Sequence, residues 1–268
     1  MRKYVFILLL CIYSMGLSQT CPLNINFSSG SLSHWNAYTG NNQNGNGPTA
    51  IKSYYDTINA APLGTLNATS IPEYGTSLPG IQLMNSGSYD QFGNFSTVPV
   101  INGYNYGYSI MLGSTSITST SGGKGGYIRG ISYYIKVPAG TGPYTMTYAY
   151  AMVLENGSHN SSQQPLLQAN LTTQDNSTID CASYSYLLPT LNNAGQTGNG
   201  ATLDAVAAAK EGFVLSPIPS PNNNGNNGES KYRVYYKGWT EVTYDLSAYR
   251  GQTVRLTFEA DNCVPGGH

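Results

Sequence analysis

Charged side chains are scarce in this chain of 268 residues. Asp, Glu, Lys and Arg together make up 9% of it, against about a quarter of an average globular protein. The 12 Lys and Arg balance 13 Asp and Glu, so the formal net charge is −1. Without a basic excess to neutralise phosphates, nucleic-acid binding is not expected. A hydrophobic fraction of 40%, with 23 Tyr, is enough to build a core and argues against a disordered chain.

Sequence motifs of the common enzyme classes are missing as well. The chain has no Gly-x-Ser-x-Gly nucleophile elbow, no His-Glu-x-x-His helix, no Walker loop and no Cys-x-x-Cys pair. A Ser-His-Asp triad would have to use one of only three histidines. No pair among the 13 acidic residues stands out as the two carboxylates of a glycosidase. We therefore expect this chain not to be an enzyme.

No apolar run is long enough to span a membrane as a helix. Arg2 and Lys3 precede an apolar stretch over 4–13, which is about half of the roughly 20 residues that cross a bilayer. A small-x-small cleavage site follows over 16–18. This order is typical of a secretory signal peptide. We expect residues 1–18 to be removed and residues 19–268 to work outside the cell.

Cysteine is rare, and removal of the signal peptide would leave an odd number of cysteines in the mature chain. Cys11 leaves with the signal peptide, so Cys21, Cys181 and Cys263 remain in a compartment where thiols normally pair. The chain also stops over 264–268, directly after a strand pattern. Both features predict a domain truncated at its C-terminus, with a fourth cysteine in the missing part. The alternative is a free thiol in a naturally short protein.

Helical periodicity is nearly absent, and the alternation of residues that marks strands dominates. Only 203–211, with its run of alanines, is expected to be helical. Many short strands between Gly, Asn and Pro turns predict an all-β fold, a single antiparallel β-sandwich of the jelly-roll kind over 19–268. The expected strands cover 23–27, 33–38, 81–84, 96–101, 104–112, 127–137, 144–154, 166–173, 181–187, 231–236, 239–246 and 253–260.

Two of these strands show the alternation most clearly. Over 144–154, Tyr and Met residues share one face, where Tyr148 and Tyr150 are expected to fill the sheet. The other face carries Thr, Ala and Val, small enough to pack under another sheet. Over 253–260, apolar residues alternate with Arg, Thr and Glu, which predicts a half-buried strand with a wet outer face. Trp35 is expected to anchor the core.

Residues with metal-binding chemistry follow both of these strands. Glu155 and His159 come after the first, and Asp261 and His268 after the second. If the two strands are neighbours that run in the same direction, their ends bring these four residues together. Two imidazoles and two carboxylates are acceptable ligands for zinc or another divalent cation. The hypothesis is a divalent-cation site, and the alternative interpretation is a pair of ordinary polar loops.

Four separated blocks, which cover nearly all of the chain after the signal peptide, resemble one family. They read CPLNINFSSGSLSHWNAYTG, YAMVLENGSHNSSQQPLLQANL, IDCASYSY and YKGWTEVTYDLSAYRGQTVRLTFEADNCVPGGH. These blocks are similar to the N-terminal region of very large secreted cell-surface proteins of the Bacteroidota. Such adhesins carry PKD or other immunoglobulin-like repeats downstream and a sorting domain read by the type IX secretion system. The stretch over 239–254 alone is shared by many MAM-like and galactose-binding-like sandwiches.

The resemblance implies a jelly-roll domain exposed outside the outer membrane, with roles in attachment or gliding. It supplies no catalytic residues. In this family the Gly-Gly-His motif is normally followed by an aromatic-rich strand and a cysteine, whereas this chain ends at His268. Cys21 is then the natural partner of the missing cysteine, which leaves Cys181 to pair with Cys263. The competing pairing joins Cys21 to either of the other two.

Two functions compete on these grounds. The first is a non-catalytic binding module of a large adhesin-like protein, whose loop tyrosines bind a glycan or a protein surface. Tyr38, Tyr54, Tyr55 and Tyr89 are the candidate binding residues. The second is an accessory carbohydrate-binding domain of a secreted hydrolase whose catalytic domain lies beyond residue 268. Immunoglobulin-like repeats downstream would favour the first, and a hydrolase domain the second.

Overall fold

The largest sheet of the protein has six strands. The computed structural model describes residues 21–41, 51–54, 70–72, 79–113, 127–157, 159, 163–179, 181–191, 202–220 and 233–263. The order in the sheet is β13 (Tyr184–Leu187), β12 (Leu166–Thr173), β18 (Thr253–Asp261), β10 (Tyr127–Lys136), β1 (Asn36–Asn41) and β2 (Ile51–Tyr54). Every pairing in this sheet is antiparallel.

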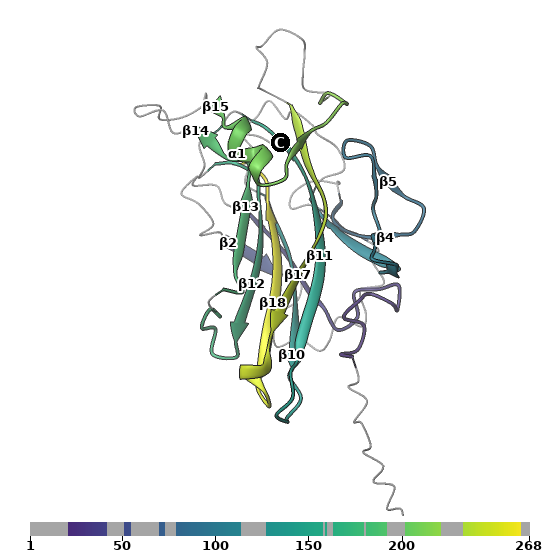
Figure 1. Cartoon of the computed structure of the whole chain (residues 1–268), viewed down its shortest axis with the longest axis vertical. Coiled ribbons are helices and arrows are strands. Elements are labelled where there is room, and N and C mark those ends of the chain that lie inside the picture. Colours follow the sequence, from purple (N-terminus) through teal and green to yellow (C-terminus); the bar gives the residue numbers. More distant parts are fainter. Residues whose placement is uncertain are drawn as a thin grey trace, which may run out of the picture.

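A smaller antiparallel sheet packs against the first (Figure 1). It consists of β11 (Thr145–Glu155), β17 (Val234–Asp245) and β16 (Val214–Leu215). Between the two sheets, the ring of Tyr148 from β11 meets the ring of Phe258 from β18 edge to face, with centroids 4.9 Å apart. The all-β antiparallel sandwich is therefore confirmed, while the jelly-roll connectivity stays a prediction.

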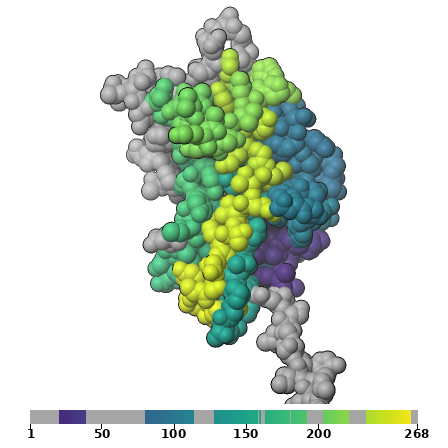
Figure 2. Space-filling model, viewed as in Figure 1, coloured from purple at the N-terminus to yellow at the C-terminus, as the bar shows by residue number. Residues whose placement is uncertain are grey.

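A third group of strands lies beside β11 and β17, in blue in Figure 2. One sheet joins β3 (Ser70–Pro72), β4 (Pro79–Asn85) and β9 (Tyr108–Leu112), and two hairpins join β5 (Tyr89–Asp90) to β6 (Phe95–Ser96) and β7 (Val100–Ile101) to β8 (Tyr104–Asn105). The indole N–H of Trp239 in β17 donates to the backbone carbonyl of Ser96 over 2.7 Å. This bond fastens the first hairpin to the smaller sheet.

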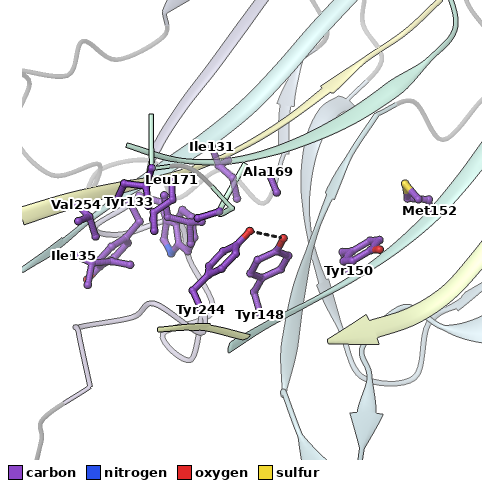
Figure 3. Close-up of a cluster of buried hydrophobic side chains, with 14 of the residues drawn as sticks. Ile131, Tyr133, Ile135, Tyr148, Tyr150, Met152, Ala169, Leu171, Tyr244 and Val254 are labelled. Atoms are coloured by element: carbon purple, nitrogen blue, oxygen red, sulfur yellow. Dashed lines mark hydrogen bonds between the residues drawn. The ribbon is translucent and has the colours of Figure 1, made fainter. Parts of the chain in front are cut away.

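Tyrosine fills much of the core between the two large sheets (Figure 3). Tyr148, Tyr150 and Tyr244 are all buried, and the hydroxyls of Tyr148 and Tyr244 lie 3.2 Å apart in a shared hydrogen bond. The bond offsets the cost of removing both hydroxyls from water. The expectation that Tyr148 and Tyr150 fill a sheet face is confirmed. Trp35, 2% exposed, stacks on Phe27 and anchors one end of the core as predicted.

β11 turns its large side chains, not its small ones, toward the opposing sheet. The sequence suggested that the face with Thr, Ala and Val would pack under another sheet. In the structure the tyrosine and methionine face does so, because larger apolar side chains remove more surface from water. The small face, which includes Thr147 and Ala149, is left to border a groove.

Several of the strand predictions are wrong. The strands expected over 96–101 and 104–112 are each interrupted, the first between β6 and β7 and the second between β8 and β9. Residues 23–27 form successive turns, because Asn24 and Phe27 adopt left-handed φ angles of 54° and 59°. The two strands expected over 231–236 and 239–246 are a single strand, β17. Its register with β11 shifts between Tyr150 and Met152, where Gly238 and Trp239 lie opposite the single residue Ala151, as in a β-bulge.

The expected helix is confirmed as α1 (Ala205–Lys210). Asp204 caps its start, because the side-chain oxygen accepts hydrogen bonds from the N–H groups of Val206 and Ala207. Gly212, with a φ of 87°, follows its end. The remaining short elements are β14 (Thr190–Leu191), which pairs with β15 (Thr202–Leu203), and the 3-10 turn η1 (Ser247–Tyr249).

The outer face of β18 is buried at its C-terminal end, where a wet face was expected. Glu259 and Asp261 are 2% and 7% exposed. The hydroxyl of Tyr38 in β1 donates to Glu259 Oε2 over 2.5 Å, across the intervening strand β10. Gly130 makes this possible, because a Cβ there would lie 2.1 Å from the Tyr38 ring. The prediction failed because the pattern of one strand does not show which side chains of neighbouring strands cover its outer face.

Candidate binding groove

A groove of about 760 Å³ follows the edge of β11. Consecutive residues of a strand point to opposite faces of a sheet, yet Thr147, Tyr148 and Ala149 all line this one hollow. That is possible only if the hollow runs along the edge of the strand and reaches both faces. We call it the β11 groove, and from this strand and its N-terminal flank it is lined by residues 144–151.

Besides β11, the groove is lined by the N-terminal turns over 21–27 and by three larger walls. The outer wall is the outward face of β17, the floor is the inner face of the six-stranded sheet, and the far wall belongs to the segment that contains β8 and β9. In the same order, the main lining residues are Trp239, Glu241 and Thr243; Ile131, Ile135, Leu256 and Phe258; and Tyr104, Tyr106, Tyr108 and Ile110. The groove therefore opens the sandwich between its smaller sheet and the third group of strands.

Charge is almost absent from this lining. Of the described residues that line the β11 groove, Glu241 alone carries a charge. It accepts hydrogen bonds from the Tyr106 hydroxyl over 2.7 Å and from the Asn102 amide over 3.5 Å. Burial, reinforced by the bond to Glu241, raises the pKa of Tyr106 well above its usual value. Tyr106 stays a neutral donor, so the site suits an uncharged ligand with a polar group near Glu241.

Exposed apolar side chains stand near the mouth of the groove. Tyr104 is 56% exposed, and its ring packs edge-on against Tyr106 with centroids 4.9 Å apart. Val100, from the same hairpin, is 66% exposed. Large apolar side chains gathered beside a concave surface are typical of binding sites.

A second hollow, of about 460 Å³, continues along β11. It shares Ala151, Leu167 and Trp239 with the β11 groove. Glu155 and Asp261 both line it. The ends of β11 and β18 thus face the same hollow, although the two strands belong to different sheets and are not the neighbours that the metal hypothesis required.

The proposed metal ligands are not assembled into a site. Glu155 accepts a hydrogen bond from the Ser220 hydroxyl, and the backbone carbonyl of the buried His159 accepts one from the Gln164 amide over 3.0 Å. Within the described ranges, no three His, Cys, Asp or Glu side chains lie close enough to share an ion. The described residues Glu155, His159 and Asp261 thus do not form a three-residue metal group. His268 lies outside the described residues, and the divalent-cation site stays a prediction from the sequence.

The four candidate binding tyrosines differ in their location and exposure in the structure. Tyr38 is buried at 5% exposure and bonded to Glu259, so its assignment to a binding surface is wrong. Tyr54 lies in β2, opposite Tyr38 in the register. Tyr55 lies outside the described residues. Tyr89 in β5 is 69% exposed and borders the second hollow, which leaves it available to a ligand.

A buried charged cluster lies at the end of β18, next to the second hollow. Arg129 has no exposed surface, and its Nη1 donates to Asn262 Oδ1 over 2.6 Å. Burial lowers the pKa of Arg129 from 12.5 to about 10, and the negative charge of Asp261 acts in the opposite direction. Gly80 approaches so closely that a Cβ there would lie 2.7 Å from Arg129 Nε. This packing identifies the cluster as part of the structural core.

Replacement of Arg129 is expected to destabilise the fold. Arg129→Met keeps most of the side-chain volume but leaves Asp261 buried without this positive charge, which costs about 3 kcal/mol of unfolding free energy. Urea unfolding measures the loss. Lys136→Met is the matched control, because Lys136 is exposed on the same strand, and it should change stability by less than about 0.5 kcal/mol. Equal losses in both variants would contradict the structural role of Arg129.

The predicted pairing of Cys181 with Cys263 is not present. No disulfide joins the cysteines of the described residues. Cys181 is exposed and adopts a left-handed φ of 62°, whereas Cys263 is fully buried. A disulfide requires the two sulfurs to approach to about 2 Å, and the pairing stays a prediction from the sequence.

Sequence reasoning missed the residues that shape the β11 groove, above all Tyr106, Trp239 and Glu241. One signal was available, because Tyr104, Tyr106 and Tyr108 alternate between Asn and Gly residues, a pattern that places aromatic rings on a short, turn-rich segment. The contact between this segment and β17 spans more than 130 positions in sequence. No local pattern predicts such a contact.

No protein-family model, no curated protein and no solved structure matches this chain. The resemblance to surface adhesins therefore stays a prediction from the sequence. Among the described residues, none of the helices is long and apolar enough to cross a bilayer.

Proposed function

We propose that this chain is a non-catalytic binding module of an exported, adhesin-like protein, and that its ligand lies in the β11 groove. The observation that carries the proposal is the groove itself, about 760 Å³ in volume, rich in aromatic side chains and neutral apart from Glu241. Concave, largely apolar sites with a few fixed polar groups are the usual binding sites of proteins.

The setting of the module follows from the sequence. The expected signal peptide over 1–18 supports work outside the cell. The resemblance to Bacteroidota adhesins supports attachment to a glycan or protein surface, export through the outer membrane, and immunoglobulin-like or PKD domains of the same protein as neighbours. Ligand binding rather than catalysis is also consistent with the missing enzyme motifs.

The alternative function is an accessory carbohydrate-binding domain of a secreted hydrolase. Exposed rings favour it, because Tyr89 and Tyr104 are 69% and 56% exposed and flat aromatic faces stack on sugars. If this function holds, Tyr104→Ala should abolish binding to soluble oligosaccharides, and the binding should not depend on the interior of the β11 groove.

Filling the groove tests the first function. Ala151→Trp places an indole where the two hollows meet and should weaken ligand binding at least tenfold, about 1.4 kcal/mol. Isothermal titration of the purified chain with synthetic peptides and with soluble oligosaccharides measures this change. Ala209→Trp is the matched control, because Ala209 is exposed on α1 and does not line either hollow.

Circular dichroism confirms that both tryptophan variants are folded before they are compared. Equal affinity of the two variants and the unmodified chain for every ligand that binds would show that the β11 groove is not the site, and the proposed function would then be wrong.

A further inference from the structure

The edge of β11 that faces the groove is open among the described strands. In the part of the chain that the structure describes, β11 is hydrogen-bonded to β17 on one side only, and it ends the order β11-β17-β16. β9, on the far wall, likewise pairs with β4 alone among the described strands. An edge strand presents a row of unsatisfied N–H and C=O groups, which is a template for another extended chain.

The register shows which backbone groups point into the groove. The N–H of Leu246, just after β17, donates to the carbonyl of Tyr144 over 2.7 Å. In an antiparallel pair, hydrogen-bonded and non-hydrogen-bonded positions alternate. Every second residue from Tyr144 therefore bonds to β17, and the residues between them, Thr145, Thr147 and Ala149, direct N–H and C=O toward the open edge.

A side-chain contact supports this register. The hydroxyls of Thr147 and Thr243, which are opposite each other in the ladder, lie 2.7 Å apart. Side chains come closest at non-hydrogen-bonded positions. Thr147 is thus one of the residues whose N–H and C=O point into the groove. This agrees with the register deduced from the hydrogen bond at Tyr144.

The side chains along this edge leave room for a backbone. Thr145, Thr147, Ala149 and Ala151 are small, so a second strand can approach to the usual spacing of about 4.8 Å. The edge from Thr145 to Ala151 is about 20 Å long, enough for about seven residues of extended chain. The floor below it, with Ile131 and Phe258, would accept alternate apolar side chains.

The lining favours a peptide over a glycan. Sugar hydroxyls buried without polar partners cost free energy, and much of the lining is aromatic or aliphatic, including Ile135, Leu256 and Phe258. A peptide strand instead satisfies the groups on the edge with its own backbone. Glu241 is the one charged residue among the described lining residues, and it is already hydrogen-bonded to Tyr106. The described lining therefore offers no cation to an acidic side chain, and most of it is uncharged.

We infer that the β11 groove binds an extended, uncharged peptide strand that adds to the open edge of β11, an inference that rests on the proposed function. The peptide donates to the carbonyls and accepts from the N–H groups of Thr145, Thr147 and Ala149. Its alternate side chains fit between the two sheets, where the floor is apolar.

The first test uses peptides of defined chemistry. The probes are acetylated and amidated peptides of about seven to nine residues, in which Val or Ile alternates with Thr or Ser. A matched set has the same sequences with N-methyl groups on every second amide, which removes the donors of one strand edge. Titration of the full chain should show binding of the first set and at least tenfold weaker binding of the methylated set.

A pair of protein variants tests whether the N–H groups of the β11 edge bind the peptide. Ala149→Pro removes the N–H that points into the groove but no bond to β17, so the fold should survive. Ala149→Val adds bulk and keeps the N–H. We expect Ala149→Pro to weaken peptide binding at least tenfold and Ala149→Val less than threefold.

Amide hydrogen exchange of the unmodified chain, followed by NMR, makes the test independent of any variant. Without peptide, Thr145, Thr147 and Ala149 should exchange quickly, and Met146 and Tyr148 slowly. Added peptide should slow the first three selectively. Slowing of all five alike, or of none, would overturn the inference.

The outcomes separate the two proposals. Binding of soluble hexasaccharides but of none of the peptides at ~1 mM would overturn the peptide inference and leave the proposed function standing. If neither class binds, both are wrong. If a peptide binds but its affinity is unchanged both by N-methylation and by Ala149→Pro, strand addition is not the mode of recognition.

Discussion

Gly130→Ala should lower the free energy of unfolding by about 3 kcal/mol or more. The new Cβ would lie 2.1 Å from Cζ of Tyr38, so the ring must leave its place over β10. Its movement breaks the buried hydrogen bond to Glu259. Forced repacking costs about 1–3 kcal/mol, and loss of a hydrogen bond to a charged group about 1.5–3 kcal/mol. Urea unfolding at neutral pH measures the change.

Two controls identify the cause of this loss. Gly238→Ala also changes a strand glycine, but a Cβ there meets nothing within 4 Å, so its stability should be unchanged or slightly higher. In the background of Tyr38→Ala, the added methyl group no longer clashes, and Gly130→Ala should then cost almost nothing. Additive losses in the double variant would mean that the Tyr38 ring is not what Gly130 accommodates.

Alkaline pH should unfold the protein cooperatively. Burial is the largest cause that raises the pKa of seven tyrosines above the ordinary value of 10, namely Tyr106, Tyr133, Tyr144, Tyr148, Tyr186, Tyr235 and Tyr244. In the unfolded chain these groups ionise near pH 10. Their contribution to stability is fully present below pH 10 and is lost as the pH rises above it.

The number of protons released on unfolding measures this linkage. At about pH 10 each of the seven tyrosines is half ionised in the unfolded chain and less ionised in the fold. Unfolding should therefore release protons, at most about three per molecule. Arg129 acts in the opposite direction, because its pKa is lowered to about 10 in the fold, but it is one group against seven. Urea unfolding between pH 9 and 11 gives the proton number from the slope.

Removal of two of the hydroxyls provides the control. Tyr148→Phe and Tyr244→Phe each delete a buried phenolic hydroxyl and should lower the number of protons released, by at most about half a proton at pH 10. Each also removes the hydrogen bond between the two hydroxyls, so stability at neutral pH should fall by about 1 kcal/mol. A free energy of unfolding that does not change from pH 9 to pH 11 would contradict the prediction.

Local patterns predicted those secondary-structure elements that are specified by residues close together in the sequence. Over 144–154, strict alternation of large and small residues marked β11, and the alanine run with Asp204 before it marked α1. Both depend on residues within a few positions of one another. The strand expected over 23–27 failed for the opposite reason, because Asn24 holds a turn there by hydrogen bonds to Ser31 and Ser33 farther along the chain.

The candidate metal and tyrosine sites show where such patterns stop. The metal hypothesis requires β11 and β18 to be neighbours with similar polar residues at their ends, but the two strands lie in different sheets. Tyr38 lies at the end of an expected strand, where a loop position is predicted, yet its side chain crosses Gly130 to reach Glu259, 221 positions away. In both cases the deciding fact is a strand neighbour, which the residues of one strand do not specify.

By itself, the sequence determined that this is an all-β protein with tyrosine in its sheets. It also predicts an export signal, and its low charge argues against binding to nucleic acid. Alternation, turn residues and composition act within a few positions, so they can be predicted from the chain. The tertiary structure alone decided that β11 is an edge strand and that Tyr106, Trp239 and Glu241 meet beside it. These contacts join segments more than 130 positions apart, and they form because packing of the whole sandwich excludes water there.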